Sequence, residues 1–259
     1  MSKSRRNRQR KHDSVSYESI ASGGSDMKKL YIILGAVVVL VGFMMLWGGP
    51  GSLIPAAREP VEVAGLDDVA TLVQVAQGIT RGDPDAPITI VEFGDYQCPG
   101  CAGFASLVEP SLLAAYVETG KAKFVYYDFP LVSVHPHAFL AARAARCAGD
   151  QERYWEYHGM LFGNQSSWAL SSNPTSMFVG YSGRLGLDEG VFESCLRSDE
   201  HAETVSANMR LGEEMGVTGT PYVLVQSDDE MPQVVDTSFE AIQEVMETLL
   251  AEGSDEGGS

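Results

Sequence analysis

Basic residues are scarce along most of this chain. Of its 18 Lys and Arg, eight lie before residue 30, which leaves 10 in residues 51–259 against 32 Asp and Glu. A surface with this excess of negative charge repels phosphate groups, which excludes nucleic acid as a partner of this part of the chain. Disorder of the whole chain is also excluded, because 44% of the 259 residues are apolar, enough for one core of ordinary domain size.

Cysteine is rare as well. There are four cysteines, and none lies in the first 97 residues. An even number is compatible with an oxidising compartment. No internal repeat with a period of 20 to 50 residues is found, so a repeat architecture is not expected.

One stretch lacks charge altogether. The 18 residues from Leu30 to Trp47 are uncharged, and as a helix they would span roughly 27 Å, close to the hydrocarbon core of a bilayer. Because Lys28 and Lys29 precede this stretch, the N-terminus is expected in the cytoplasm and the rest of the chain outside. The alternative is a cleaved signal peptide, but its apolar core would usually be ~7 to 15 residues long after a shorter leader. We therefore favour an uncleaved transmembrane helix.

The other segments are divided by composition. Residues 1–29 are polar, Ser-rich and basic, and are predicted to form a disordered cytoplasmic tail. Residues 48–80, rich in Gly and Pro at their start, are predicted to be a linker and N-terminal extension. A domain is expected over 81–252, followed by an acidic tail over 253–259.

A strand–helix–strand unit opens the predicted domain. The apolar run at 88–93 predicts a buried strand, the spacing of apolar residues over 102–119 predicts a helix, and 121–127 predicts a second strand. Pro110 lies within that helix and predicts a kink. The unit is expected to close as a right-handed parallel crossover.

The remainder of the domain is mostly helical. An antiparallel hairpin over 222–226 and 233–235 and a last helix over 239–251 are predicted to complete it. Before the hairpin, no strand-like run interrupts a series of predicted helices at 137–148, 151–162, 176–185, 191–196 and 201–215.

Two cysteines stand where the first strand leads into the helix. The unpaired amides of the first turn favour a thiolate, so the pKa of Cys98 is expected to be depressed to ~3.5 to 7.5. Pro99 lacks an N–H and has the φ of the first turn, which stiffens the loop. Cys101 lies about one turn further along and could attack a mixed disulfide on Cys98.

Two other interpretations of this pair were weighed. A zinc site would need two more ligands, for which His135 and His137 are candidates, while Cys147 and Cys195 are single and far apart in sequence. The two cysteines could also be inert apolar packing. The strand–loop–helix context favours redox chemistry over both.

At this point the sequence resembles a known family. It is similar to the membrane-anchored bacterial type of DsbA-like thiol-disulfide oxidoreductases of the thioredoxin superfamily, over about residues 82–250. The segments that carry the resemblance are IVEFGDYQCPGC (90–101), YYDFPL (126–131), HPHAFLAARAARC (135–147), YWEYHGMLF (154–162) and GVTGTPYVLV (216–225). The resemblance implies an α/β thioredoxin fold with a helical insertion at about 134–215, here preceded by the single transmembrane helix.

The resemblance also implies roles for residues outside the cysteine pair. Thr220 and Pro221 occupy the position of the cis-proline loop, although spacing alone would equally allow a trans turn proline. Glu92 resembles the buried acid that exchanges protons with the inner cysteine; the alternative is a solvent-facing side chain. Relatives of the anchored type often carry a pair such as Cys147 and Cys195, so a structural disulfide is expected rather than two free thiols. It would stabilise the fold by roughly 3 to 4 kcal/mol.

The sequence therefore predicts an extracytoplasmic oxidase that introduces disulfides into exported proteins through Cys98 and Cys101. The resemblance implies reoxidation by a quinone-linked membrane partner of the DsbB or vitamin K epoxide reductase type. Since Pro-Gly between the cysteines differs from the Pro-His of the best-known oxidases, a reductase or isomerase, for example in cytochrome c maturation, is the alternative. A non-catalytic peptide-binding chaperone is a further one. No cofactor or metal is expected, and Tyr154, Trp155 and Phe162 are predicted to be core residues.

Overall fold

The computed structural model describes residues 31–32, 35, 57–227 and 230–256. By internal contacts the chain divides into Met1–Leu53 and Ile54–Ser259, and the second unit holds the domain described here. Of the predicted transmembrane helix, only Tyr31, Ile32 and Gly35 are among the described residues, and all three are helical. The predicted tail over 1–29 lies wholly outside them.

The centre of the domain is a five-stranded sheet with the order β1-β3-β2-β4-β5. Strands β2 and β3 are parallel, with Ile88 opposite Ala122, and the other neighbouring pairs are antiparallel. All seven residues of β2 are buried, which explains why its sequence is mostly apolar. The strand bounds are Ile79–Arg81 for β1, Ile88–Gly94 for β2, Ala122–Asp128 for β3, Tyr222–Ser227 for β4 and Gln233–Val235 for β5.

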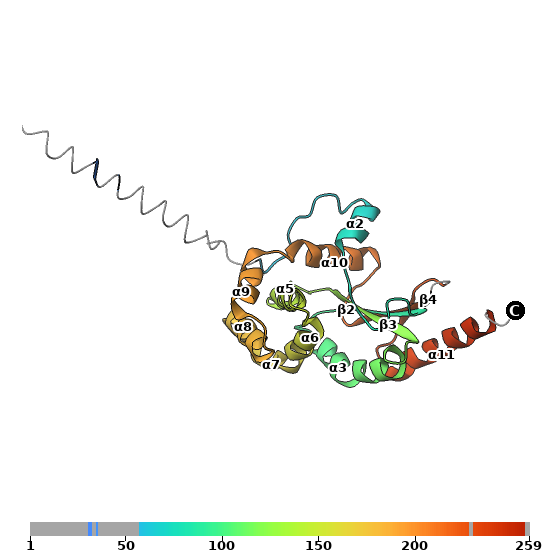
Figure 1. The fold of residues 1–259 in the computed structure, drawn as a ribbon. Coiled ribbons are helices and arrows are strands. Elements are labelled where there is room, and N and C mark those ends of the chain that lie inside the picture. Colours follow the sequence, from blue (N-terminus) through green and yellow to red (C-terminus); the bar gives the residue numbers. More distant parts are fainter. Residues whose placement is uncertain (1–30, 33–34, 36–56, 228–229, 257–259) are drawn as a thin grey trace, which may run out of the picture. The chain divides into compact units, whose positions relative to one another are not determined.

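Helices cover both faces of this sheet (Figure 1). Alternate residues of β2 point to opposite faces, so Ile88, Ile90 and Glu92 share one face while Val91 and Phe93 share the other. The first face is covered by α3 (Pro99–Leu107) and α11 (Phe239–Glu256), and the second by α10 (Ala202–Glu214). Glu92 therefore points into the core beneath the helix that carries the cysteines.

The predicted helical insertion is present between β3 and β4. In Figure 1 most of its helices gather beside the sheet rather than on its faces. Its helices before α10 are α5 (Ala138–Gly149), α6 (Tyr154–Gly163), α7 (Gln165–Trp168), α8 (Pro174–Arg184) and α9 (Glu189–Ser198). The expected disulfide between Cys147 and Cys195 is also present and joins α5 to α9.

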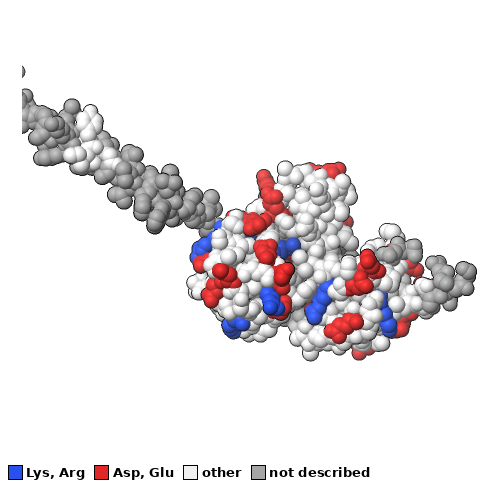
Figure 2. Space-filling model, viewed as in Figure 1, with Lys and Arg blue, Asp and Glu red and all other residues white. Residues whose placement is uncertain are grey.

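Buried charge ties this insertion to the sheet. Arg146 of α5 is 5% exposed and its Nε donates to Asp128 Oδ2 at the end of β3, at 2.6 Å. Arg143, one turn earlier, is fully buried and donates to the Leu196 carbonyl oxygen of α9 at 2.9 Å. Each guanidinium therefore fixes α5 to a neighbouring element. Elsewhere, Figure 2 shows acidic side chains spread over the face in view with fewer basic ones between them.

Both ends of the domain differ from the prediction. Helix α2 (Val69–Val75), capped by the Asp68 side chain, and strand β1 were not predicted, so the folded domain begins before residue 81. The apolar patterns of α2 and β1 are short, and the surrounding segment was predicted to be a linker. At the other end α11 continues to Glu256, past the predicted helix end and into the supposed acidic tail.

The helix predicted over 102–119 is divided into three segments rather than kinked once. Segment α3 is followed by α4 (Glu109–Leu112) and by a π-helical turn, η1 (Leu113–Val117). Pro110 lies in the first turn of α4, where its missing N–H removes no hydrogen bond. Among the described residues, Pro99–Val117 is the one stretch long and apolar enough to cross a membrane. Its residues Phe104, Leu112 and Tyr116 belong to the hydrophobic core of the domain.

Candidate active site

Cys98 lies at the N-terminus of α3. It is the N-cap residue, in extended conformation, and Pro99 occupies the first helical position. The Cys98 N–H donates to the Asp95 carbonyl oxygen at 3.0 Å, and the Cys98 carbonyl oxygen accepts from Ala102. Cys98 is 9% exposed whereas Cys101 is fully buried, and both are free thiols. Both cysteines are thus buried, and Cys98 keeps slightly more contact with solvent than Cys101.

The same placement separates the pKa values of the two thiols. A hydrogen bond with the Cys101 thiol is the main cause that lowers the pKa of Cys98 to about 5, and the backbone N–H groups of Gly100 and Cys101 act in the same direction. Burial raises the pKa of Cys101, and its hydrogen bond to Cys98 and the charge of Glu92 raise it further. At neutral pH Cys98 is thus a thiolate and Cys101 a thiol.

The loop before β4 faces Cys98. The peptide bond between Thr220 and Pro221 is cis, and Cys98 Sγ lies 3.4 Å from the Thr220 carbonyl oxygen. A Cβ atom placed on Gly100 would lie 3.2 Å from Pro221 Cδ, which is closer than ordinary packing. Glycine at position 100 therefore lets the helix and this loop approach each other closely.

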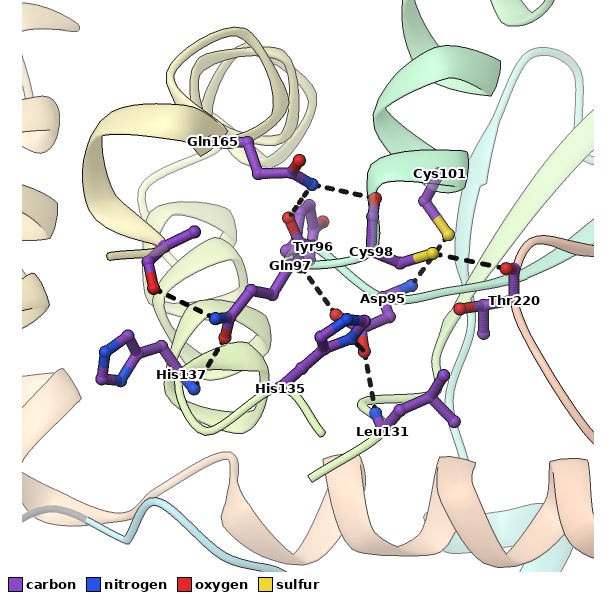
Figure 3. Close-up of polar contacts among 11 residues, drawn as sticks. Asp95, Tyr96, Gln97, Cys98, Cys101, Leu131, His135, His137, Gln165 and Thr220 are labelled. Atoms are coloured by element: carbon purple, nitrogen blue, oxygen red, sulfur yellow. Dashed lines mark hydrogen bonds and ion pairs between the residues drawn. The ribbon is translucent and has the colours of Figure 1, made fainter. Parts of the chain in front are cut away.

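Asp95 connects the cysteine loop to the segment after β3 (Figure 3). Its N–H donates to Cys101 Sγ at 3.4 Å. Its carboxylate accepts from the Gln97 N–H at 2.6 Å, from the Leu131 N–H at 2.8 Å, and contacts His135 Nδ1 at 2.7 Å. Burial raises the pKa of Asp95, while these hydrogen bonds oppose that shift. The Asp95 side chain thus joins the cysteine loop to the segment that follows β3.

Two glutamines join the same loop to the helical insertion. Gln165 Nε2 donates to the carbonyl oxygens of Tyr96 and Cys98, at 2.8 and 2.9 Å (Figure 3). Gln97 Oε1 accepts from the His137 N–H at 2.8 Å, and Gln97 Nε2 donates to a carbonyl of α7's C-terminal end at 3.1 Å. Sequence reasoning missed Asp95, Gln97 and Gln165 because isolated polar residues carry no spacing signal. Of the two histidines considered as zinc ligands, His135 contacts Asp95 through its ring, whereas His137 contributes only its backbone N–H to the loop.

Glu92 is buried beneath α3 without a partner. It is 0% exposed, and neither carboxylate oxygen has a hydrogen bond to any described residue. Burial raises its pKa well above the ordinary value, and the charges of Glu109 and Cys98 add to the shift. A buried acid of this kind stays protonated at pH values where an exposed glutamate has already ionised.

Comparisons with known proteins agree with this geometry. A family model described as thioredoxin matches residues 74–245. An antiporter, Na(+)/H(+) antiporter NhaA 1 of Salinispora arenicola, is 30% identical over 203 residues, 77% of this chain, but the chain spans only 30% of that protein. The probable disulfide bond formation protein D of Bacillus cereus is 26% identical over 60% of this chain and 76% of its own.

Solved structures show the same fold. Wolbachia pipientis alpha-DsbA1 is matched with a TM-score of 0.62 and 20% identity over 71% of this chain and 98% of its own. Oxidised BdbD of Bacillus subtilis is matched with a TM-score of 0.59 and 22% identity over 75% and 97%. The chain therefore belongs to the thioredoxin family and has the fold of the DsbA-like proteins.

Proposed function

We propose that this chain is an extracytoplasmic thiol-disulfide oxidoreductase that acts as an oxidase on exported proteins with cysteine thiols. The observation that carries the proposal is the asymmetry of the cysteine pair: Cys98, which is 9% exposed, has a pKa of about 5, and the fully buried Cys101 beside it has a raised pKa. The name of the Bacillus cereus relative, probable disulfide bond formation protein D, supports the same activity.

The pair would work in two exchanges. A substrate thiolate attacks Cys98 Sγ of the oxidised enzyme, the Cys98–Cys101 bond breaks, and Cys101 leaves and takes up a proton. The second substrate thiol, as thiolate, then attacks the substrate sulfur of the mixed disulfide, and Cys98 leaves as thiolate. The substrate loses two electrons and the enzyme gains them. Because Cys98 is a good leaving group, the second exchange favours release of oxidised substrate.

Glu92 is proposed as the proton donor to Cys101. It lies on the face of β2 beneath α3, and its charge contributes to the raised pKa of Cys101. A protonated acid can neutralise the leaving Cys101 thiolate in a site that excludes water. In the reverse direction its carboxylate would accept the proton.

Substrate would bind along the cis-proline loop. The Thr220 carbonyl oxygen faces Cys98, so an extended segment of substrate could pair with this backbone as a short added strand. Backbone pairing places few demands on substrate sequence. This suits an enzyme that acts on many unfolded chains.

The direction of electron flow rests on thiolate stability. A stabilised Cys98 thiolate stabilises the reduced enzyme, which makes the disulfide a stronger oxidant. The Pro-Gly dipeptide supplies no side-chain charge to this thiolate, so a reductase or isomerase remains the second candidate. The reduction potential separates the two.

The proposal includes a membrane anchor and a membrane partner that reoxidises the cysteine pair. The uncharged segment 30–47 would hold the domain outside the membrane with the N-terminus in the cytoplasm. Reoxidation would come from a quinone-linked membrane protein of the DsbB or vitamin K epoxide reductase type, whose effective concentration the anchor would raise.

The experiment uses the full-length chain in detergent, oxidised and mixed with a reduced, unfolded protein that contains two thiols. The oxidase proposal predicts stoichiometric substrate oxidation and a potential above that of the glutathione couple. A potential below it would favour the reductase. A Cys98→Ala variant that aids substrate folding as well as the parent would favour the chaperone alternative and contradict catalysis.

A further inference from the structure

A second group of metal-ligating side chains lies away from the active site. Cys147 Sγ, Asp150, Cys195 Sγ and His201 each offer one ligand atom, and these atoms all lie within 4.8 Å of one another. The two sulfurs form the disulfide that joins α5 to α9. Neither His201 nor Asp150 takes part in the exchange chemistry proposed above.

Three helix ends bring these four residues together. Cys147 lies in the last turn of α5 and Asp150 is the C-cap of the same helix. Cys195 lies in the last turn of α9, and His201 is the N-cap of α10. The carbonyl ends of α5 and α9 place partial negative charge near the cluster, which favours a cation. The N-terminus of α10 opposes this in part.

The oxygen and nitrogen ligands are already in contact. His201 Nε2 lies 2.8 Å from Asp150 Oδ2, and the same oxygen lies 3.4 Å from Cys195 Sγ. In a tetrahedral zinc site, bonds of ~2.0 to 2.3 Å place neighbouring ligand atoms ~3.3 to 3.8 Å apart. The two separations just given lie within ~0.5 Å of that range, and the remaining pairs of ligand atoms are no more than 4.8 Å apart. The larger movement is the separation of the two sulfurs once their bond is broken.

Solvent reaches the cluster through an adjoining cavity. This cavity is about 510 Å³, and its lining includes Asp150, Cys195 and Glu200 but no Lys or Arg. The Asp150 side chain is 41% exposed and that of His201 is 19% exposed. A cation could enter from this acidic side without displacing a basic group.

We propose that Cys147, Asp150, Cys195 and His201 bind one zinc ion when the disulfide is reduced. Two thiolates, an imidazole and a carboxylate in tetrahedral reach form a ligand set that suits zinc rather than the oxygen-seeking calcium or magnesium. Helices α5 and α9 are then cross-linked by the disulfide under oxidising conditions and by the metal under reducing conditions.

The chemistry balances with a dithiol reductant. It breaks the Cys147–Cys195 bond and becomes a disulfide itself, so two electrons and two protons pass to the cysteines. Zinc binding then releases both thiol protons to water, because the thiolate is the ligand. Oxidation would reverse these steps and expel the ion.

The test uses Co²⁺ as a spectroscopic probe for the zinc site. The full-length Cys98→Ser/Cys101→Ser variant, which leaves only the second pair, is reduced with a phosphine, freed of the reagent and titrated with Co²⁺ in the absence of oxygen. We expect one Co²⁺ per chain, with the thiolate charge-transfer and visible bands of tetrahedral cobalt, displaced by an equivalent of Zn²⁺. Zn²⁺ should also raise the thermal midpoint of the reduced chain.

Variants in the same background assign the ligands. His201→Ala and Asp150→Ala should each weaken binding at least ~10-fold, since even residues that only support a ligand cost that much. Glu200→Gln, an acid in the same cavity outside the ligand set, should bind as the parent does. If circular dichroism shows that an alanine variant is unfolded, His201→Gln and Asp150→Asn replace it.

Three results would overturn the proposal. The first is a reduced chain that shows no thiolate charge-transfer band. The second is binding that neither His201 nor Asp150 substitution weakens, which would mean two thiols holding an adventitious ion. The third is equal binding by the unreduced chain, in which the sulfurs are bonded to each other.

Discussion

The hydrogen bond between the two active-site thiols has the largest predicted effect on reactivity. It is the main cause of the lowered Cys98 pKa of about 5, ahead of the backbone N–H groups of Gly100 and Cys101. The Cys101→Ala substitution removes this donor and keeps the backbone amides. A hydrogen bond to a charged group contributes ~1.5 to 3 kcal/mol, or ~1 to 2 pKa units. The pKa of Cys98 in Cys101→Ala is therefore expected at ~6 to 7.

The assay is the pH dependence of Cys98 alkylation in the reduced-active-site chain. Cys147 and Cys195 are bonded to each other and do not react. Cys101→Ser, which keeps a hydroxyl donor, is the matched control and should shift the pKa of Cys98 less than alanine does. A parent chain whose Cys98 titrates near the ordinary 9.0, or a Cys101→Ala variant with an unchanged Cys98 pKa, would refute the reasoning.

The lowered pKa of Cys98 also affects the reduction potential of the cysteine pair. The thiolate stabilises the reduced fold fully above the ordinary pKa of 9.0, and this contribution is lost as pH falls through about 5. At neutral pH the lowered pKa favours the reduced form about 100-fold, which is ~60 mV toward a stronger oxidant. Loss of the Cys101 thiol itself removes the couple, so this shift is measured on the parent chain across pH.

Three further predictions concern stability. Since burial raises the pKa of Glu92 above its ordinary 4.5, the folded state disfavours its ionised form; Glu92→Gln should raise the free energy of unfolding by ~1 to 3 kcal/mol at neutral pH, a gain that disappears below that ordinary value. Removing the disulfide with Cys147→Ala/Cys195→Ala should lower the free energy of unfolding by about 4 kcal/mol for a 48-residue separation. Arg146→Met leaves Asp128 buried without its ion-pair partner and should cost ~3 to 5 kcal/mol.

Denaturant unfolding at several pH values measures all three. Arg153→Met is the control for the buried ion pair, because Arg153 and Glu156 form an exposed pair worth ~0 to 1 kcal/mol. Equal losses in Arg146→Met and Arg153→Met would contradict the role given to burial. A Glu92→Gln gain that persists in acid would show that ionisation is not its cause. No loss on removing the disulfide would contradict the chain-entropy argument.

Much of the fold could be predicted because its strands and helices have strong patterns. The mostly apolar runs of β2 and β4 and the helical spacing after β3 all reflect how these elements are buried. Helix α2 and strand β1 were missed because they are short and depend on contacts with α10 and β3, which lie far along the chain. Such elements are set by tertiary packing rather than by local pattern.

Some active-site residues could be predicted from the sequence and others could not. Cys98 and Cys101 were identifiable from their place between a strand and a helix, and Pro221 from the resemblance. Asp95 and Gln165 were not, since their hydrogen bonds reach residues 36 and 67 positions away. Likewise, nothing in the sequence relates His201 to the cysteine pair in α5 and α9, because three helix ends must meet before these side chains do.

The most direct test of the central claim is to identify the sulfur that bonds to substrate. Full-length Cys101→Ala is incubated with a peptide activated as a mixed disulfide, and the linked products are mapped by mass spectrometry after proteolysis. The account predicts a stable adduct on Cys98 alone, formed at a rate that falls in acid as the Cys98 thiolate is protonated. No adduct at Cys98, or adducts only at Cys147 or Cys195, would contradict the proposed exchange chemistry.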